Sequence, residues 1–156
     1  DMRKLALHRP QDAIICACDG VNYLDSLKAA EEFFEAANAA LKVGGLLLFD
    51  ISSQYKLENI LGCNTFAEDE QGGAYIWKNN YDPKSRLIEM NLTFFERHGE
   101  LYRRFTERHM QRAHGVDELL KALNRAGFDA EAYDFETMDP VKPDSERVQF
   151  SGRKRR

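Results

Sequence analysis

Several polar side chains lie at the end of a long apolar stretch of the sequence. Their side-chain types could take part in a reaction. The stretch Leu41–Ser52, LKVGGLLLFDIS, contains an unbroken apolar run that leads to Asp50 and Ser52, and Ser53 comes next. An apolar run without alternation is typical of a central strand in a parallel sheet, which is covered on both faces. Such sheets bind ligands beyond the carboxyl ends of their strands. We therefore expect Asp50, Ser52 and Ser53 beside a cofactor or a substrate.

The elements that position these side chains are indicated by the apolar pattern of the first third of the chain. The pattern predicts a strand at residues 13–18, a helix at about residues 26–41 and a strand at residues 46–51. Gly44 and Gly45 are expected to end the helix in a left-handed conformation. A strand, a helix and a strand in this order form a right-handed unit with parallel strands.

The rest of the chain changes to an antiparallel pattern. After a short helix at residues 54–62, residues 75–112 alternate apolar and polar side chains and predict a three-stranded meander. An amphipathic helix is expected at residues 116–126. Two late strands are expected around residues 128–135 and 147–152, and the last one should lie antiparallel beside the strand at 46–51.

Composition and charge narrow the class of protein. The chain has 156 residues and a net charge of -4, which is typical of one ordinary domain and argues against a nucleic-acid binder. Cys16, Cys18 and Cys63 are an odd number of cysteines without metal-site spacing, so we expect reduced thiols, a cytoplasmic protein and no metal. No apolar stretch reaches the ~20 residues that span a membrane.

As a set, these residues resemble the later part of a class I S-adenosylmethionine-dependent methyltransferase, of the bacterial small-molecule type with an antiparallel insertion. The resemblance covers nearly the whole chain. It is carried by DMRKLAL, DAIICACDGVNYL, AALKVGGLLLFDIS, YIWKNNYD, ERHMQRAHGVDELLKALNRAGFDAEAYDF and RVQFSGRK. It implies an α/β, Rossmann-like sheet with helices on both faces, of which this chain would contain strands four to seven of seven.

The resemblance also implies that part of the domain is missing. No GxGxG turn is present, and QGGAY is in the wrong context to replace it. We expect residues 1–156 to form a single, N-terminally truncated methyltransferase domain, with residues 75–112 as a substrate cap. We expect such a chain alone to bind S-adenosylmethionine weakly or not at all, and the free edge of the strand at 13–18 to favour pairing with another copy of the chain.

The cofactor implied by the resemblance is S-adenosylmethionine. Asp1 and Met2 match the family's short motif after strand three, where an acidic side chain reaches the adenine amino group and the next residue flanks the ring. Asp19, Asn22 and Tyr23 follow strand four, beside the reacting methyl group, where Tyr23 could offer an aromatic face to the sulfonium. The alternative is that Asp1 is a frayed end, that Asp19 and Asn22 only make the turn and that Tyr23 packs on the next helix.

The meander is the expected wall for the methyl acceptor. His109 is the best candidate for a base because histidine titrates near neutral pH, although a lone histidine on a strand is more often a packing or surface residue. Trp77, Tyr81 and Arg112 are candidate substrate-binding residues, although a tryptophan in the position of Trp77 is more often a core residue. Asp50 is a further candidate wall residue, unless it caps the short helix that follows.

Three classes of function stay open. The first is a methyltransferase for an unidentified, small-molecule acceptor. The second is a non-catalytic, methyltransferase-like remnant that serves as an interaction module. The third, a nucleotide-dependent oxidoreductase, is disfavoured by the closing antiparallel strand pair. The residues that precede Asp1 in the parent gene would distinguish the first class from the second.

Overall fold

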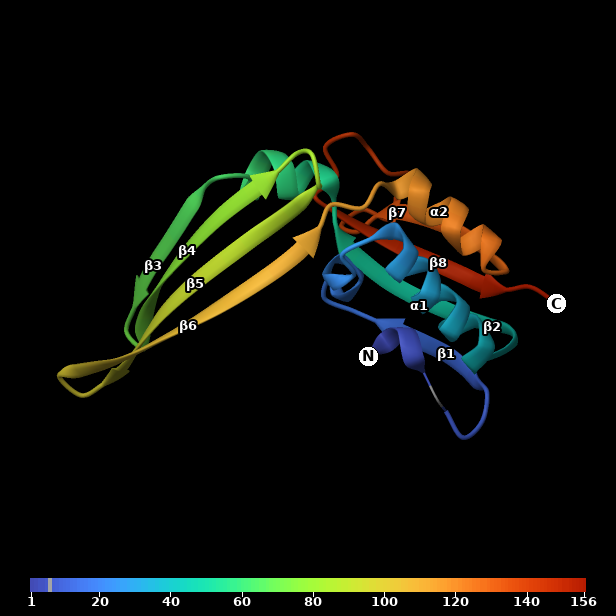
Figure 1. Cartoon of the computed structure of the whole chain (residues 1–156), viewed down its shortest axis with the longest axis horizontal. Coiled ribbons are helices and arrows are strands. Elements are labelled where there is room, and N and C mark those ends of the chain that lie inside the picture. Colours follow the sequence, from blue (N-terminus) through green and yellow to red (C-terminus); the bar gives the residue numbers. More distant parts are fainter. Residues whose placement is uncertain (6) are drawn as a thin grey trace.

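The computed structural model describes residues 1–5 and 7–156 and contains two four-stranded sheets (Figure 1). The first has the order β1-β2-β8-β7, with β1 Gln11–Cys16, β2 Leu41–Ser52, β7 Phe128–Asp134 and β8 Arg147–Lys154. The second has the order β3-β4-β5-β6, with β3 Thr65–Glu70, β4 Gly73–Asp82, β5 Leu87–His98 and β6 Leu101–Arg112. Figure 1 shows the second sheet extending away from the first.

The predicted strand-helix-strand unit is confirmed. Strands β1 and β2 are parallel and are joined by α1 (Leu27–Ala40). The helix begins after Ser26, whose Oγ accepts a hydrogen bond from the Ala29 N–H at 3.1 Å. This N-cap favours the helix start because it satisfies a backbone amide that would otherwise be unpaired. Strand β8 is antiparallel to β2 and lies between β2 and β7, as the sequence predicted.

The predicted role of the two glycines is wrong. Helix α1 ends at Ala40, and Leu41 is already extended, with φ -97° and ψ 149°. Gly44 instead lies inside β2 with φ +78°, a conformation that glycine adopts without steric cost. The register passes from Gln11↔Leu41 to Ala13↔Leu46, so the glycines belong to a bulge that carries the extra residues of β2.

Both α-helices pack on the same face of the first sheet, where a single aromatic-rich core holds them. Helix α2 (Val116–Arg125) contributes to the same core as α1, in which the Phe34 and Phe49 rings lie 5.4 Å apart and Phe49 stacks on Phe150 at 4.7 Å. The α/β fold class is confirmed, but the expected helices on both faces are not found in the described residues. Leu46 and Leu48, on the other face of β2, are accordingly only half-buried.

The antiparallel part is larger than the predicted meander. It has four strands, because β3 precedes the three that the sequence predicted, and it therefore begins at Thr65. The expected short helix at residues 54–62 is confirmed as the π-helix η3 (Lys56–Leu61). This helix packs on the base of the antiparallel sheet in a second core, formed by Leu57, Leu61, Tyr81, Ile88, Met90 and Ala113.

Strand β1 forms one edge of the first sheet. In the described part of the chain its only strand partner is β2, and Ile15 is 71% exposed. Pairing of two copies through this edge stays a prediction. Neither α-helix among the described residues has the length and apolar character needed to cross a membrane.

Stability is expected to depend on pH through His114, which joins β6 to α2. Its ring is completely buried, and its Nε2 lies 2.9 Å from the Leu24 carbonyl oxygen. Burial lowers the pKa of His114 from its ordinary value of 6.5. The unfolded chain therefore takes up a proton at this residue at a higher pH than the folded chain does. We expect the free energy of unfolding to be fully retained above about pH 6.5 and to fall as the pH drops towards 5.

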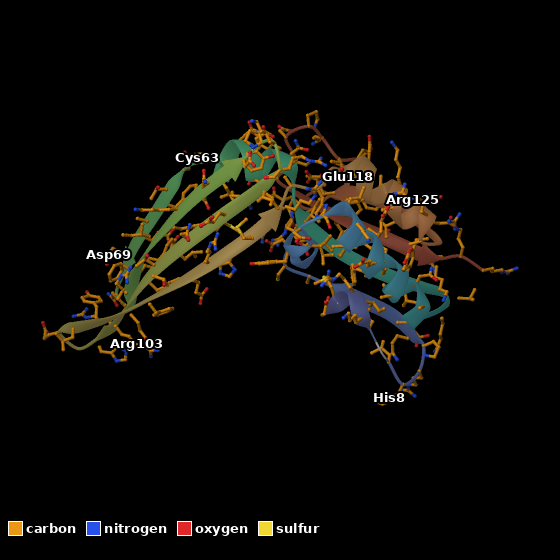
Figure 2. All side chains as sticks on the ribbon, viewed as in Figure 1. His8, Cys63, Asp69, Arg103, Glu118 and Arg125 are labelled. Carbon is orange, nitrogen blue, oxygen red and sulfur yellow. The ribbon has the colours of Figure 1, made fainter. Side chains whose placement is uncertain are left out.

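Urea unfolding at a series of pH values tests this expectation. The His114→Gln variant should show a flatter pH dependence between pH 7 and 5 than the wild type. His8→Gln is the matched control, because His8 is exposed and lies on a loop far from Glu118 and α2 (Figure 2). An unchanged pH dependence in the His114 variant would contradict the assignment.

Candidate active site

A cavity of about 360 Å³ lies where the two sheets meet. The first sheet and its loops contribute polar lining residues, which are Asp19, Tyr23, Ser52 and Arg147. The second sheet contributes Trp77, Met90, Leu92, His109 and Gln111. Because Asp19 follows β1 and Ser52 ends β2, the cavity lies at the carboxyl ends of the parallel strands, as expected for a ligand site in such a sheet.

An arginine bridges two carboxylates at the base of this cavity. The Arg147 Nε donates to Asp50 Oδ2 at 2.7 Å, and its Nη2 lies 3.4 Å from Asp19 Oδ1. The Asp19 N–H also donates to Asp50 Oδ2, at 3.1 Å, and Gln111 Nε2 donates to Asp19 Oδ2 at 2.6 Å. Asp50 is only 4% exposed and does not line the cavity. From outside the cavity lining, Asp50 therefore orients the Arg147 side chain and the Asp19 backbone by these hydrogen bonds.

A second polar chain connects the two sheets across the cavity. The Tyr23 hydroxyl lies 2.9 Å from His109 Nδ1, and His109 Nε2 lies 3.2 Å from Glu107 Oε2. A carboxylate only accepts hydrogen bonds, so this bonding assigns the proton of a neutral His109 to Nε2. His109 Nδ1 is then free to accept the Tyr23 hydroxyl proton. The Tyr23 side chain, 47% exposed as a residue, presents its oxygen to the cavity wall.

Asn22 is completely buried and holds the two sheets together. Its Nδ2 donates to the Ser52 and Arg112 carbonyl oxygens, both at 2.9 Å, and its Oδ1 accepts from the Ser52 N–H at 3.0 Å. Both amide hydrogens and the amide oxygen are thus engaged with the backbone of β2 and β6. These contacts position the backbone of β2 and β6 relative to each other, and the cofactor contact that the resemblance implied for Asn22 stays a prediction.

The other residues that were expected to bind the methyl acceptor fall into two groups, one that lines the cavity and one that does not. Trp77 lines the cavity and also packs on Phe66, with ring centroids 5.5 Å apart. The same side chain therefore serves the cavity wall and the core packing. Tyr81 is buried in the second core and does not line the cavity. Arg112 also lies outside the lining, and its Nη1 donates to the Ser85 carbonyl oxygen at 3.1 Å.

Asp1 and Met2 form the beginning of the 3₁₀-helix η1 (Met2–Lys4). Asp1 is its N-cap and accepts from the Arg3 N–H at 3.1 Å, while Arg3 Nη2 pairs with its other oxygen at 2.7 Å. Met2 packs on the first core. Its Cε lies close to Gly20 in the loop after β1, since a Cβ built on Gly20 would be 3.9 Å from it. The same Cβ would lie 2.8 Å from Cys16 Sγ, so only glycine fits at this position without a shift.

The sheet order and the site together define a class of protein. An antiparallel β8 inserted between β2 and β7, and a cavity at the carboxyl ends of β1 and β2, are the features expected of the second half of a Rossmann-like class I methyltransferase sheet. The resemblance of the chain to S-adenosylmethionine-dependent methyltransferases is confirmed by similarity in sequence and in structure.

Individual relatives carry this conclusion, while no protein-family model matches the chain. The chain is 33% identical over 157 residues to "Putative methyltransferase YqeM" of Bacillus subtilis (strain 168), covering 99% of this chain and 63% of the relative. The crystal structure of an S-adenosylmethionine-dependent methyltransferase from Clostridium acetobutylicum ATCC 824 matches with a TM-score of 0.93 and 32% identity, over 100% of this chain and 63% of that one.

A more distant structure supports the fold alone. CalS10, an amino pentose methyltransferase from Micromonospora echinaspora with bound S-adenosylmethionine, matches with a TM-score of 0.75 and 19% identity, over 98% of this chain and 62% of that one. The chain thus spans a little less than two thirds of the length of the relatives that it matches.

Proposed function

We propose that this chain forms the acceptor side of an S-adenosylmethionine-dependent methyltransferase that acts on a small molecule. The observation that carries the proposal is the Tyr23–His109–Glu107 chain at the wall of the cavity. A phenol, an imidazole and a carboxylate in sequence can remove a proton from a nucleophile and stabilise the resulting imidazolium. The cavity volume of about 360 Å³ is in the range of small-molecule sites.

The residues at the end of β1 fit one side of the cofactor. When bound, S-adenosylmethionine supplies a methyl group that its positive sulfur already makes electrophilic. Met2 and the loop from Asp19 to Tyr23 lie together there. The loop would hold the side of the cofactor that faces the acceptor, and Met2 would flank the adenine ring, as the resemblance implies. The Tyr23 ring would favour a positive sulfur by cation–π attraction. The Asp1 carboxylate is held by Arg3, which reduces its availability for adenine.

Proton transfer through the polar chain follows from its hydrogen bonds. A nucleophile that carries a proton would donate it to the Tyr23 oxygen, while the Tyr23 hydroxyl proton moves to His109 Nδ1. Glu107 holds the Nε2–H and balances the charge of the imidazolium. Asp19, Gln111 and Arg147 would orient the polar part of the acceptor, since they present both charges at one wall.

Apolar side chains supply the other wall of the cavity. Trp77, Met90 and Leu92 from the antiparallel sheet line the cavity together with the polar residues Asp19, Ser52 and Arg147 of the first sheet and its loops. An apolar wall excludes water from the reacting groups, and positioning of the nucleophile is the main contribution that methyl transfer requires from a protein. The antiparallel sheet is therefore proposed as the substrate cap, now with bounds at Thr65 and Arg112.

A methyl-transfer screen tests the proposal. The full-length protein is incubated with S-adenosylmethionine labelled in its methyl group and with separate sets of phenols, carboxylic acids and amines. We expect label to move to one of these sets and the transfer to stop when S-adenosylhomocysteine is added. Cofactor binding without transfer to any set would argue against this function.

Tyr23→Phe is expected to lower the transfer rate roughly ten- to hundredfold, because the phenylalanine ring keeps the aromatic face but cannot relay a proton. Tyr55→Phe is the matched control, since Tyr55 is a partly exposed tyrosine outside the lining of the cavity. The ratio of the two rates, measured with the acceptor that the screen identifies, is the decisive quantity. Equal rates in the two variants would exclude Tyr23 from proton transfer.

A further inference from the structure

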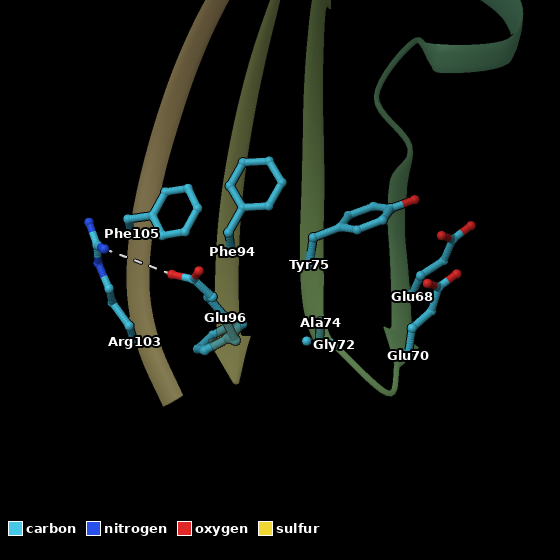
Figure 3. Close-up of a pocket in the computed structure, with 11 residues that line it drawn as sticks. Glu68, Glu70, Gly72, Ala74, Tyr75, Phe94, Glu96, Arg103 and Phe105 are labelled. Carbon is cyan, nitrogen blue, oxygen red and sulfur yellow. Dashed lines mark ion pairs between the residues drawn. The ribbon is translucent and has the colours of Figure 1, made fainter. Parts of the chain in front are cut away.

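The antiparallel sheet carries a second, larger cavity of about 560 Å³ at its end remote from the first sheet. Figure 3 shows three aromatic side chains side by side across neighbouring strands, and we name Tyr75, Phe94 and Phe105 the aromatic platform. They are directly opposite one another in the strand register. The Tyr75 and Phe94 rings lie 6.3 Å apart, and Phe94 stacks on Phe105 at 5.0 Å.

The aromatic platform lies on the same face of the sheet as the candidate active site. Successive side chains of a strand point to opposite faces, so Tyr75 shares a face with Trp77, and Phe105 shares a face with His109. Trp77 and His109 line the first cavity. The distance along β6 from His109 to Phe105 is about 14 Å, from a rise of about 3.4 Å per residue. The two cavities therefore belong to one continuous face.

The charge around the aromatic platform is predominantly negative. Glu68 and Glu70, on β3, line this cavity and form no ion pair within the described residues. Glu96 lies 3.8 Å from Arg103, which also lies over the Phe105 ring at 5.9 Å. Burial raises the pKa of the Tyr75 hydroxyl, and the Glu68 and Glu70 carboxylates raise it further, which agrees with a negative local potential.

We propose that the aromatic platform is a distal subsite for the methyl acceptor, and that it takes a flat aromatic group attached to a positively charged amine. The inference rests on the proposed function, whose cavity it extends. Aromatic faces attract cations, and the Glu68 and Glu70 carboxylates, which form no ion pair within the described residues, add to this preference. The acceptor is accordingly elongated, because its flat group at Phe105 would lie about 14 Å along β6 from His109.

The fluorescence of Trp77 can be used to measure ligand binding at the subsite. Trp77 is the only tryptophan in the 156-residue chain and lies two residues from Tyr75 on β4. Three probes share a phenyl ring and a four-carbon chain but differ in charge: 4-phenylbutylamine, 4-phenylbutanol and 4-phenylbutyrate. In titrations followed by Trp77 fluorescence, we expect the amine to bind roughly three- to tenfold more tightly than the alcohol, and the acid to bind most weakly. Equal affinities, or no binding by the amine, would overturn the proposal.

Variants separate the roles of ring and charge. The double change Glu68→Gln and Glu70→Gln should remove the preference for the amine while the alcohol binds as before. Phe105→Ala should weaken all three probes about tenfold or more, because a ring face is lost. Tyr102→Ala is the matched control, since Tyr102 is exposed on the opposite face of β6, and it should change nothing. Weakening by Tyr102→Ala equal to that by Phe105→Ala would overturn the assignment of the face.

Two further outcomes distinguish this inference from the proposed function. Charge-selective binding by a protein that transfers no methyl group would support the subsite and contradict the methyltransferase proposal. Methyl transfer by a protein that binds none of the probes would do the opposite. If Phe105→Ala instead converts a dimer into a monomer in light scattering and the probes do not bind, the platform is an interface between two copies, and the subsite is refuted.

Discussion

His109→Ala is expected to lower the turnover of methyl transfer by roughly two to four orders of magnitude. The variant removes the group that is placed to accept the Tyr23 proton, since Tyr23 Oη and His109 Nδ1 lie 2.9 Å apart. The affinity for the cofactor should change little, because His109 belongs to the antiparallel sheet and not to the loop after β1. Turnover and cofactor affinity are measured separately with the full-length protein and its identified acceptor.

His98→Ala is the matched control for this experiment. His98 lies on the neighbouring strand β5, and its Nε2 is 3.3 Å from Glu96 Oε2, so it reproduces the histidine–carboxylate contact outside the lining of the candidate active site. Combining His109→Ala with Tyr23→Phe should cost little more than His109→Ala alone, because both residues act in one chain. An activity of His109→Ala within a factor of a few of the wild type would reduce the residue to a packing role.

Asn22→Ala is expected to be the most destabilising change of a polar residue, at about 3 kcal/mol or more. It would leave two buried backbone groups, the Ser52 N–H and the Ser52 carbonyl oxygen, without their partner, while the Arg112 carbonyl oxygen would keep only its bond from the His114 N–H at 3.1 Å. Each buried group that loses its hydrogen bond costs about 1–3 kcal/mol. Urea unfolding at neutral pH measures the change in the free energy of unfolding.

Asn91→Ala serves as the control, because Asn91 is exposed and its side-chain amide donates to the Glu89 carboxylate at 2.9 Å and not to a buried backbone group of the described residues. It should alter the free energy of unfolding by less than about 0.5 kcal/mol. A fall in cofactor affinity of Asn22→Ala without a loss of stability would support the cofactor contact implied by the family resemblance and refute the positioning role.

The part of the fold that local patterns determine was predictable. Helix α1 and strand β2 have strong apolar patterns, and the closing strand β8 was placed correctly beside β2. Strand β3, TFAEDE, was missed because five of its six residues are exposed, so its sequence lacks the alternation that marks a strand. It is held by pairing with β4 and not by burial.

Residues of the candidate site could be predicted where their position on or just after a predicted strand indicated them. They could not be predicted where the contact joins residues far apart in the sequence. Asp19, Tyr23, Trp77 and His109 line one cavity, as expected. Arg147 was missed because its contact with Asp50 joins residues 97 positions apart, which no local pattern reveals. Glu107 was detectable, since a residue two positions before His109 on a strand shares its face.

A crystal structure of the full-length protein with S-adenosylhomocysteine tests the central claim most directly. We predict that the cofactor binds at the carboxyl end of β1, with its sulfur beside Tyr23 and facing the cavity that His109 and Trp77 line. The Tyr23–His109 hydrogen bond should be present in the complex. A sulfur turned away from this cavity, or a cofactor bound elsewhere on the protein, would contradict the account.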